Sequence, residues 1–159
     1  MQGEHHAYLP RACDHRSWLP SAWGSSYRNT RVMTVESQRV ALRVVIVDDS
    51  TYFIEAARNA LRQEGADVVG TASTIRDALR LAEALRPDVI LVDVDLGEES
   101  GFDLAEQLSA IAAANVVLIS AYPEVELSDL IAASPALGFV AKSELSTRAL
   151  SDLLGSAGR

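Results

Sequence analysis

The chain has 159 residues, 48% of them hydrophobic, and its 22 acidic and 14 basic side chains give a net charge of −8. This length suits one domain with a full core, and most of the acidic excess lies in residues 41–159. That charge excludes a broad nucleic-acid-binding surface, and no apolar stretch is long enough to span a membrane. We expect a cytoplasmic protein, because Cys13 is the only cysteine and the N-terminus lacks the apolar core of a signal peptide.

Residues 1–40 show no sustained helical or strand periodicity, and we expect them to form a disordered, dispensable tail outside a domain at 41–159. The segment "MTVESQRVALRVVIVDDS" has the character of a domain start, which makes Met33 an alternative first residue. The tail also holds a group of metal-binding residue types whose spacing matches no standard zinc pattern: His5, His6, Cys13 and His15.

From Arg43 onward, short apolar runs alternate with amphipathic ones, and Gly or Pro marks nearly every boundary. The apolar runs predict five strands: "VVIVDD", "DVVGTA", "DVILVDV", "VVLIS" and "GFVAK". The amphipathic runs predict five helices: one from Ser50 or Thr51 to Gly65, "IRDALRLAEALR" capped by Thr74 or Ser73 and ended by Pro87, "GFDLAEQLSAIAA", "EVELSDLIAA", and "ELSTRALSDLL" beginning near Ser143. Strands that are apolar throughout indicate an α/β fold, with a parallel sheet covered by helices on both faces.

Polar side chains stand where the predicted strands end: Asp48 and Asp49 after the first, Asp93 at the third, Ser120 at the fourth and Lys142 at the fifth. Because the carboxyl ends of parallel strands share one edge of the sheet, we expect these side chains to converge. Three carboxylates around a small pocket suit Mg²⁺, which would offset the repulsion between Asp48 and Asp49. An isolated pair of aspartates can also serve only to cap the next helix.

A carboxylate in such a site can accept a phosphoryl group, and Asp93 is the best candidate because it ends the central strand. Transfer requires that the phosphoryl oxygens be neutralised, which Mg²⁺, Lys142 and the Ser120 hydroxyl could do. The small side chain of Ala121 leaves room for the incoming group. Lys142 is the only lysine in the chain, and its compact ammonium suits a single oxygen better than a guanidinium does.

Four segments carry a resemblance to a known family: "VVIVDDS", "DVILVDVDLGEESGFDLAEQL", "VVLISAY" and "ALGFVAKS". Together they resemble the receiver domain of two-component response regulators, over about Val40 to Leu154. Intervals of 44, 27 and 22 residues separate Asp49, Asp93, Ser120 and Lys142, within the range of that family. The segment "GFVAKSELSTRAL" is most similar to receivers of the LuxR/NarL-type group. Since the chain stops at Arg159, we expect no output domain.

The resemblance implies a flavodoxin-like (βα)5 fold with strand order 2-1-3-4-5. It implies that Asp93 is the phosphoacceptor and that Mg²⁺ is held by four residues, Asp48, Asp49, Asp93 and Asp95, the last through its backbone carbonyl. It also implies the residues of phosphoryl contact and switching: Ser120, Ala121, Lys142 and the switch aromatic Phe139.

The implied function is a switch and not an enzyme. Its phosphate would come from a sensor histidine kinase or a histidine phosphotransfer protein. Its signal would pass to a downstream protein through the fourth helix, fifth strand and fifth helix, at Glu124–Ser134 and Phe139–Leu154. We expect no nucleic-acid or membrane partner, and homodimerisation on phosphorylation stays open. The chain has Gly97 where the family usually has proline, so we expect a more mobile loop there, and Ser143 follows the lysine where proline is common.

The sequence leaves two alternative functions open. The segment "ILVDVDLG", with Asp93 and Asp95, also resembles the opening motif of haloacid-dehalogenase-type phosphatases. That family places the motif on its first strand and its acidic pair later in the chain, whereas here the pair comes first. The other alternative is an adaptor that keeps the fold and works without phosphorylation, which an intact site argues against.

Overall fold

The structure is a computed structural model that describes residues 40–111 and 114–158. The predictions for the tail, including its histidine and cysteine group, therefore lie outside the described residues, except at Val40.

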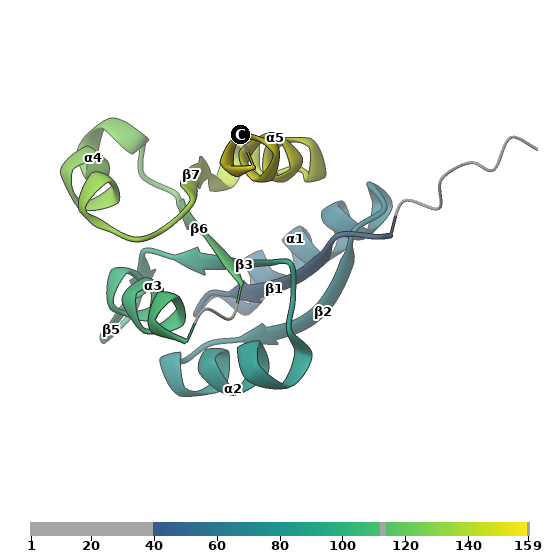
Figure 1. Cartoon of the computed structure of the whole chain (residues 1–159), viewed down its shortest axis with the longest axis horizontal. Helices are drawn as coiled ribbons and strands as arrows, with labels where there is room; N and C mark the ends of the chain where they lie inside the picture. Colours follow the sequence, from purple (N-terminus) through teal and green to yellow (C-terminus); the bar gives the residue numbers. More distant parts are fainter. Residues whose placement is uncertain (1–39, 112–113, 159) are drawn as a thin grey trace, which may run out of the picture. The chain divides into compact units, whose positions relative to one another are not determined.

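Five parallel strands form one sheet in the order β2–β1–β3–β6–β7 (Figure 1). In chain order these are β1 (Arg43–Val47), β2 (Asp67–Ala72), β3 (Val89–Asp93), β6 (Asn115–Ser120) and β7 (Gly138–Ala141). The helices are α1 (Thr51–Gln63), α2 (Ile75–Leu85), α3 (Gly101–Ala110), α4 (Glu124–Ala133) and α5 (Thr147–Ala157). The predicted parallel flavodoxin-like sheet, with its second strand at the edge and its first beside the third, is confirmed.

Side chains of successive strand residues point to opposite faces of the sheet, and each face has its own core. Val44 and Ile46 of β1 pack in a first core with residues of α1 and α5. Val45 and Val47 pack in a second core with residues of α2 and α3. Helix α4 contributes least, because none of its residues is fully buried and only Ile131 joins the second core.

The helix starts follow their capping residues. Ser50 is the N-cap of α1, where its hydroxyl accepts a hydrogen bond from the Phe53 N–H, so the cap is not one of the two preceding aspartates. Thr74 caps α2 in the same way. The prediction for the last helix was wrong by four residues: α5 begins at Thr147 after the N-cap Ser146, and Lys142–Glu144 form a separate 3₁₀ turn, η2.

The loop after β3 contains a small antiparallel hairpin that the sequence did not predict. It consists of β4 (Asp95–Leu96) and β5 (Glu99–Ser100), with Gly97 in the turn at a φ of 74°. This positive φ is readily adopted by glycine, which accounts for a glycine at this position.

Gly101, the first residue of α3, is packed directly against the backbone of the central strand. A Cβ atom built on Gly101 would lie 1.9 Å from the Asp93 carbonyl oxygen. The Gly101 N–H also donates to the Val94 carbonyl at 3.1 Å, which holds the two segments together. A side chain here would therefore push α3 away from the strand that carries Asp93.

We predict that Gly101→Ala lowers the free energy of unfolding by about 3 kcal/mol or more, the upper range for overpacking. Gly155→Ala is the matched control, because Gly155 lies inside α5 with no atom within 4 Å of the added Cβ. That variant should gain about 0.5–1 kcal/mol from the better helix propensity of alanine. Urea denaturation measures both, and equal effects of the two substitutions would contradict the packing described for Gly101.

Candidate functional site

The centre of the site is an ion cluster of one ammonium and two carboxylates. Lys142 Nζ lies 2.6 Å from Asp48 Oδ2 and 2.7 Å from Asp93 Oδ2. Side chains at alternate positions of β1, β3 and β7 pack in the first core. The next positions in this alternation are occupied by Asp48, Asp93 and Lys142, so the three side chains lie on the same side of the sheet. The predicted convergence of these three residues is confirmed.

Each carboxylate of the cluster uses its second oxygen to bind the backbone. Asp48 Oδ1 accepts a hydrogen bond from the Ser50 N–H at 2.8 Å, and Asp93 Oδ1 accepts one from the Asp95 N–H at 3.3 Å. Asp48 is fully buried and Asp93 is 6% exposed. The two carboxylates are therefore fixed in direction, with one oxygen of each turned toward the ammonium.

Phe53, at the start of α1, forms one wall beside the ammonium. Lys142 Nζ lies 4.4 Å from the centre of the Phe53 ring, a distance at which the negative ring face attracts a cation. The sequence analysis did not single out Phe53, because a phenylalanine on the buried face of an amphipathic helix is expected in any core. Only the position of the ring against Lys142 distinguishes it.

Burial and charge shift the two ends of the central ion pair. Burial raises the pKa of the Asp93 carboxyl, and the Asp48 carboxylate adds to this effect, while the bond to Lys142 opposes it. Burial alone would lower the pKa of Lys142, but its bonds to Asp48 and Asp93 outweigh burial and raise that pKa. The two carboxylates therefore stabilise the charged form of Lys142, and a nearby cation is needed to stabilise the charged form of Asp93.

A divalent metal fits this group of carboxylates. Asp48, Asp49 and Asp93 each offer an oxygen, and these atoms lie within 4.8 Å of one another. Asp48 Oδ2 is buried and, among the described residues, accepts no hydrogen bond of good geometry; it meets Lys142 in the ion pair. A set of hard oxygen donors with one buried acceptor free of hydrogen bonds suits Mg²⁺. Asp95 is exposed, and its carboxylate accepts from the Gly97 N–H at 3.1 Å, leaving its backbone carbonyl as the predicted ligand.

The remaining predicted residues lie on β6 and β7. Ser120 is 1% exposed at the end of β6, and its hydroxyl accepts from the Tyr122 N–H at 3.0 Å. Ala121 is exposed beside it. Phe139 is half-buried and packs against the second core. Within the described ranges, no hydrogen bond joins Ser120 to the ion cluster, so the site contains two groups, the carboxylates with Lys142 and the pair Ser120–Phe139.

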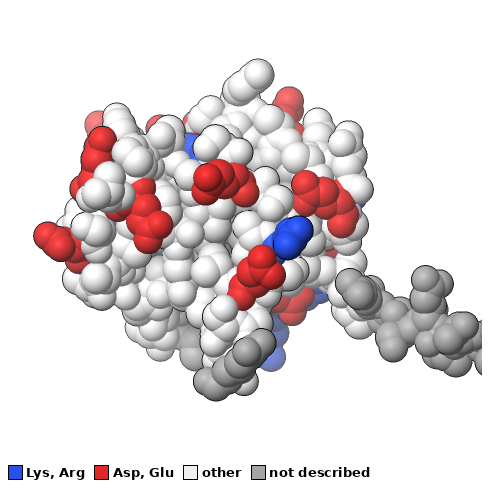
Figure 2. All heavy atoms as spheres, turned by 90° about the horizontal axis from the view of Figure 1, so that it is seen from above, with Lys and Arg blue, Asp and Glu red and all other residues white. Residues whose placement is uncertain are grey.

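The face that contains α4, β7 and α5 is acidic. Helix α4 carries Glu124, Glu126 and Asp129 and no basic residue. Viewed from above in Figure 2, Asp and Glu side chains stand over this region, whereas Lys and Arg side chains are scarce. Two large apolar side chains are also exposed on α4, Val125 at 79% and Leu130 at 55%. A basic or apolar binding partner would complement this face.

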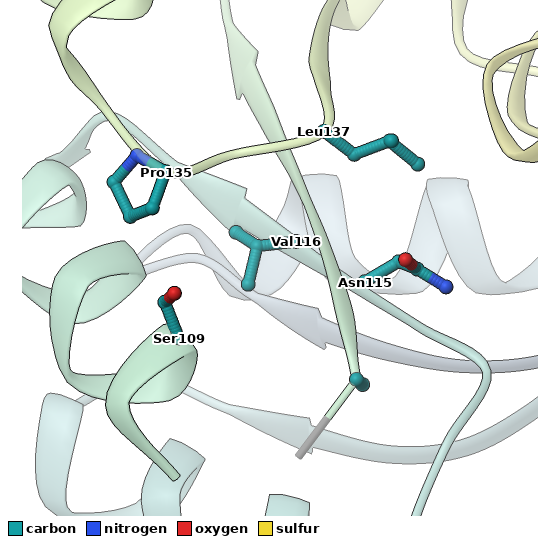
Figure 3. Close-up of a pocket in the computed structure, with 6 residues that line it drawn as sticks. Ser109, Asn115, Val116, Pro135 and Leu137 are labelled. Carbon is teal, nitrogen blue, oxygen red and sulfur yellow. The ribbon is translucent and has the colours of Figure 1, made fainter. Parts of the chain in front are cut away.

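A pocket of about 490 Å³ lies away from the carboxylates, at the start of β6 rather than its end (Figure 3). No charged side chain lines it; its residues are Ser109, Ala114, Asn115, Val116, Pro135 and Leu137. The amide of Asn115 is occupied, since it donates to the Asp88 carbonyl at 3.2 Å. The carboxylate site lies at the other end of the strands.

The chain is similar in sequence and in fold to known proteins. The family model of the response regulator receiver domain matches residues 44–153. The transcriptional regulatory protein PdtaR of Mycobacterium tuberculosis is 28% identical over 103 residues, which are 65% of this chain and 50% of that protein. The chain thus spans about half the length of this curated relative.

Solved structures of similar fold include two receivers. The signal receiver domain described for the response regulator NarL of Mycobacterium tuberculosis has a TM-score of 0.64 at 30% identity, covering 72% of this chain and 98% of that one. A LuxR-family two-component response regulator from Aurantimonas has a TM-score of 0.65 at 25% identity, covering 75% and 87%. In the described ranges, none of the helices has the length and apolar character that a membrane crossing requires.

We predict that Lys142→Ala lowers the free energy of unfolding in metal-free buffer by about 2–3 kcal/mol, somewhat below the roughly 3–5 kcal/mol for a fully buried pair. The loss arises because Asp48 and Asp93 then repel each other without a cation. Arg148→Ala removes the same charge from an exposed position on α5 and should change stability little. In the double variant with Asp93→Asn, part of the loss should be recovered. Urea denaturation in EDTA provides the measurement, and a Lys142→Ala loss no larger than that of Arg148→Ala would contradict the proposed role of the cluster.

Proposed function

The chain belongs to the response regulator receiver family, and we propose that it is a Mg²⁺-dependent phospho-aspartate switch with Asp93 as the phosphoacceptor. The observation that supports this most directly is the ion cluster, in which Lys142 contacts Asp48 and Asp93 at 2.6 and 2.7 Å. A partly buried lysine held by two carboxylates carries a desolvation cost, and a role in binding a ligand would account for its presence at the ends of parallel strands. The phosphate donor would be a phosphohistidine on a sensor histidine kinase or a histidine phosphotransfer protein.

The transfer step is a displacement at phosphorus. Asp93 Oδ2 attacks the phosphorus, the P–N bond of the phosphohistidine breaks, and the imidazole, protonated on its other ring nitrogen, leaves as a neutral ring with the electron pair of that bond. Lys142, already 2.7 Å from Asp93 Oδ2, is placed to contact a phosphoryl oxygen once Asp93 is phosphorylated. Burial, the largest cause of the raised Asp93 pKa, makes the bare carboxylate less stable and increases its need for a nearby cation.

The residues that would hold Mg²⁺ are Asp48, Asp49 and Asp93, with the backbone carbonyl of Asp95. The ion, when bound, would offset the negative charge on the phosphoryl oxygens. Asp48 and Asp49 would position it, because the first is fixed by the Ser50 N–H and the second is exposed toward the rim. These roles suit hard oxygen donors and require no thiol or imidazole.

We propose that the switch runs through Ser120 and Phe139 to the face formed by α4, β7 and α5. Ser120 would leave the Tyr122 N–H to contact the phosphoryl group, and Phe139 would turn farther inward on the neighbouring strand. Helix α4 is suited to respond, because none of its residues is fully buried and its displacement costs little packing. Residues Glu124–Ser134 and Phe139–Leu154 would present the changed surface to a downstream protein.

We propose a signalling domain at residues 41–159 that does not turn over substrate, acts in the cytoplasm and has no nucleic-acid partner of its own. The acidic charge of residues 41–159 supports the last point, since phosphate backbones would be repelled. The phosphatase alternative gains no support, because Asp93 ends a central strand that follows the acidic pair in the chain.

We predict that Asp93 is the only acceptor. With Mg²⁺ and acetyl phosphate, the wild-type protein should gain one base-labile phosphoryl group, and Asp93→Asn should gain none, because an amide oxygen is a poor nucleophile. Asp103→Asn, at an exposed position on α3, should be labelled normally. Lys142→Arg should accept label more slowly, since a planar guanidinium replaces a compact ammonium. Intact-protein mass spectrometry measures the label, and label that persists in Asp93→Asn would refute the assignment.

We predict that Asp49→Ala weakens Mg²⁺ binding by more than about tenfold, since loss of residues that merely support metal ligands already costs about 10–100-fold. The metal-free protein should be no less stable, because the substitution removes like-charge repulsion. Asp67→Ala changes the same charge at an exposed position at the opposite end of the sheet and should leave the Mg²⁺ affinity near that of the wild type. Isothermal titration calorimetry gives the affinities, and equal affinities for the two variants would contradict the proposed metal site.

A further inference from the structure

The hairpin β4–β5 is joined to helix α2 by a single side chain. Glu99 Oε2 accepts a hydrogen bond from the Ile75 N–H at 2.9 Å, across 24 residues of sequence. Ile75 is the first residue of α2, so its N–H has no acceptor within the helix. Thr74 satisfies the Asp77 N–H by capping, and Glu99 satisfies the Ile75 N–H from outside the helix. A carboxylate is favoured there by the helix dipole as well.

The same hairpin carries the backbone that borders the metal site. Glu99 pairs with Leu96, and Ser100 pairs with Asp95, whose carbonyl is the proposed fourth ligand. Gly97 in the turn lies against the rim, since a Cβ atom built on it would be 3.4 Å from Asp49 Oδ2. Leu96 is buried in the second core and anchors one strand of the hairpin, while the other strand is exposed at Glu99. Strand β5 runs directly into α3 at Gly101, and the hydrogen bond to Ile75 joins it to α2 as well.

We propose that Glu99 is a positioning residue for the metal site: by tethering the hairpin to the N-terminus of α2, it fixes the Asp95 carbonyl and the Gly97 turn beside Asp49. This inference rests on the proposed function, because it assigns Glu99 a role in Mg²⁺ binding.

The experiment compares Glu99→Ala with Glu98→Ala, which removes an equal charge from the neighbouring exposed residue of the turn. Mg²⁺ titration of the whole chain by calorimetry, without any phosphodonor, should show affinity for Glu99→Ala weakened by about two- to fivefold relative to Glu98→Ala. Glu99→Gln keeps an acceptor oxygen and should recover part of the affinity. Amide hydrogen exchange at Ile75 should accelerate in Glu99→Ala alone.

Each outcome has a distinct meaning. Unchanged exchange at Ile75 in Glu99→Ala would refute the tether itself. Faster exchange with Mg²⁺ affinity equal to that of Glu98→Ala would show that the tether exists but does not position the site, which overturns the proposal. Absence of Mg²⁺ binding by the wild-type chain would instead refute the proposed function, on which the role of Glu99 depends.

Discussion

The whole site depends on one constraint: the parallel sheet brings Asp48 and Asp93 to the same place, and Lys142 is the cation that lets both stay charged. Coulomb repulsion between two carboxylates in a partly desolvated setting opposes folding. Lys142, 18% exposed at its side chain, offsets it with contacts of 2.6 and 2.7 Å. A single ammonium therefore links the ends of β1, β3 and β7, three strands that are far apart in the chain.

The rest of the domain supplies the stability that such a cluster requires. Strands β1 and β3 contribute fully buried aliphatic side chains to both cores, and each such side chain stabilises the fold by about 1.5–3 kcal/mol. A few well-buried strand residues thus outweigh the few kcal/mol that a strained ion cluster costs. This balance allows polar side chains of the site at the carboxyl ends of strands whose interiors are apolar.

Much of the fold and of the candidate site could be predicted from the sequence, because both depend on hydrophobic periodicity and on the residues at strand ends. The apolar runs predicted the strands, and the rule that parallel strands place their carboxyl ends together predicted that Asp93 and Lys142 meet. Three contacts at or near the site were not predicted, since each depends on how one segment packs against another. The Phe53 ring faces Lys142, Glu99 binds the Ile75 N–H, and Gly101 lies against the Asp93 carbonyl. The start of α5 was misplaced because Lys142–Glu144 turn as a 3₁₀ segment before Ser146 caps the helix.

Helices α5 and α4 are held to the sheet unequally, and this asymmetry gives the proposed switch a direction. On the first face, α5 contributes the fully buried Leu150, and Glu64 at the end of α1 accepts from the Thr147 N–H at 2.6 Å, so α1 and α5 are joined. On the second face, α4 meets the sheet through half-buried residues such as Ile131 and has no fully buried side chain. Ser120 and Phe139 lie on this second side, next to the loosely held helix. A change that draws Ser120 toward Asp93 would therefore move α4 at lower free-energy cost than α5, because less buried packing must be broken.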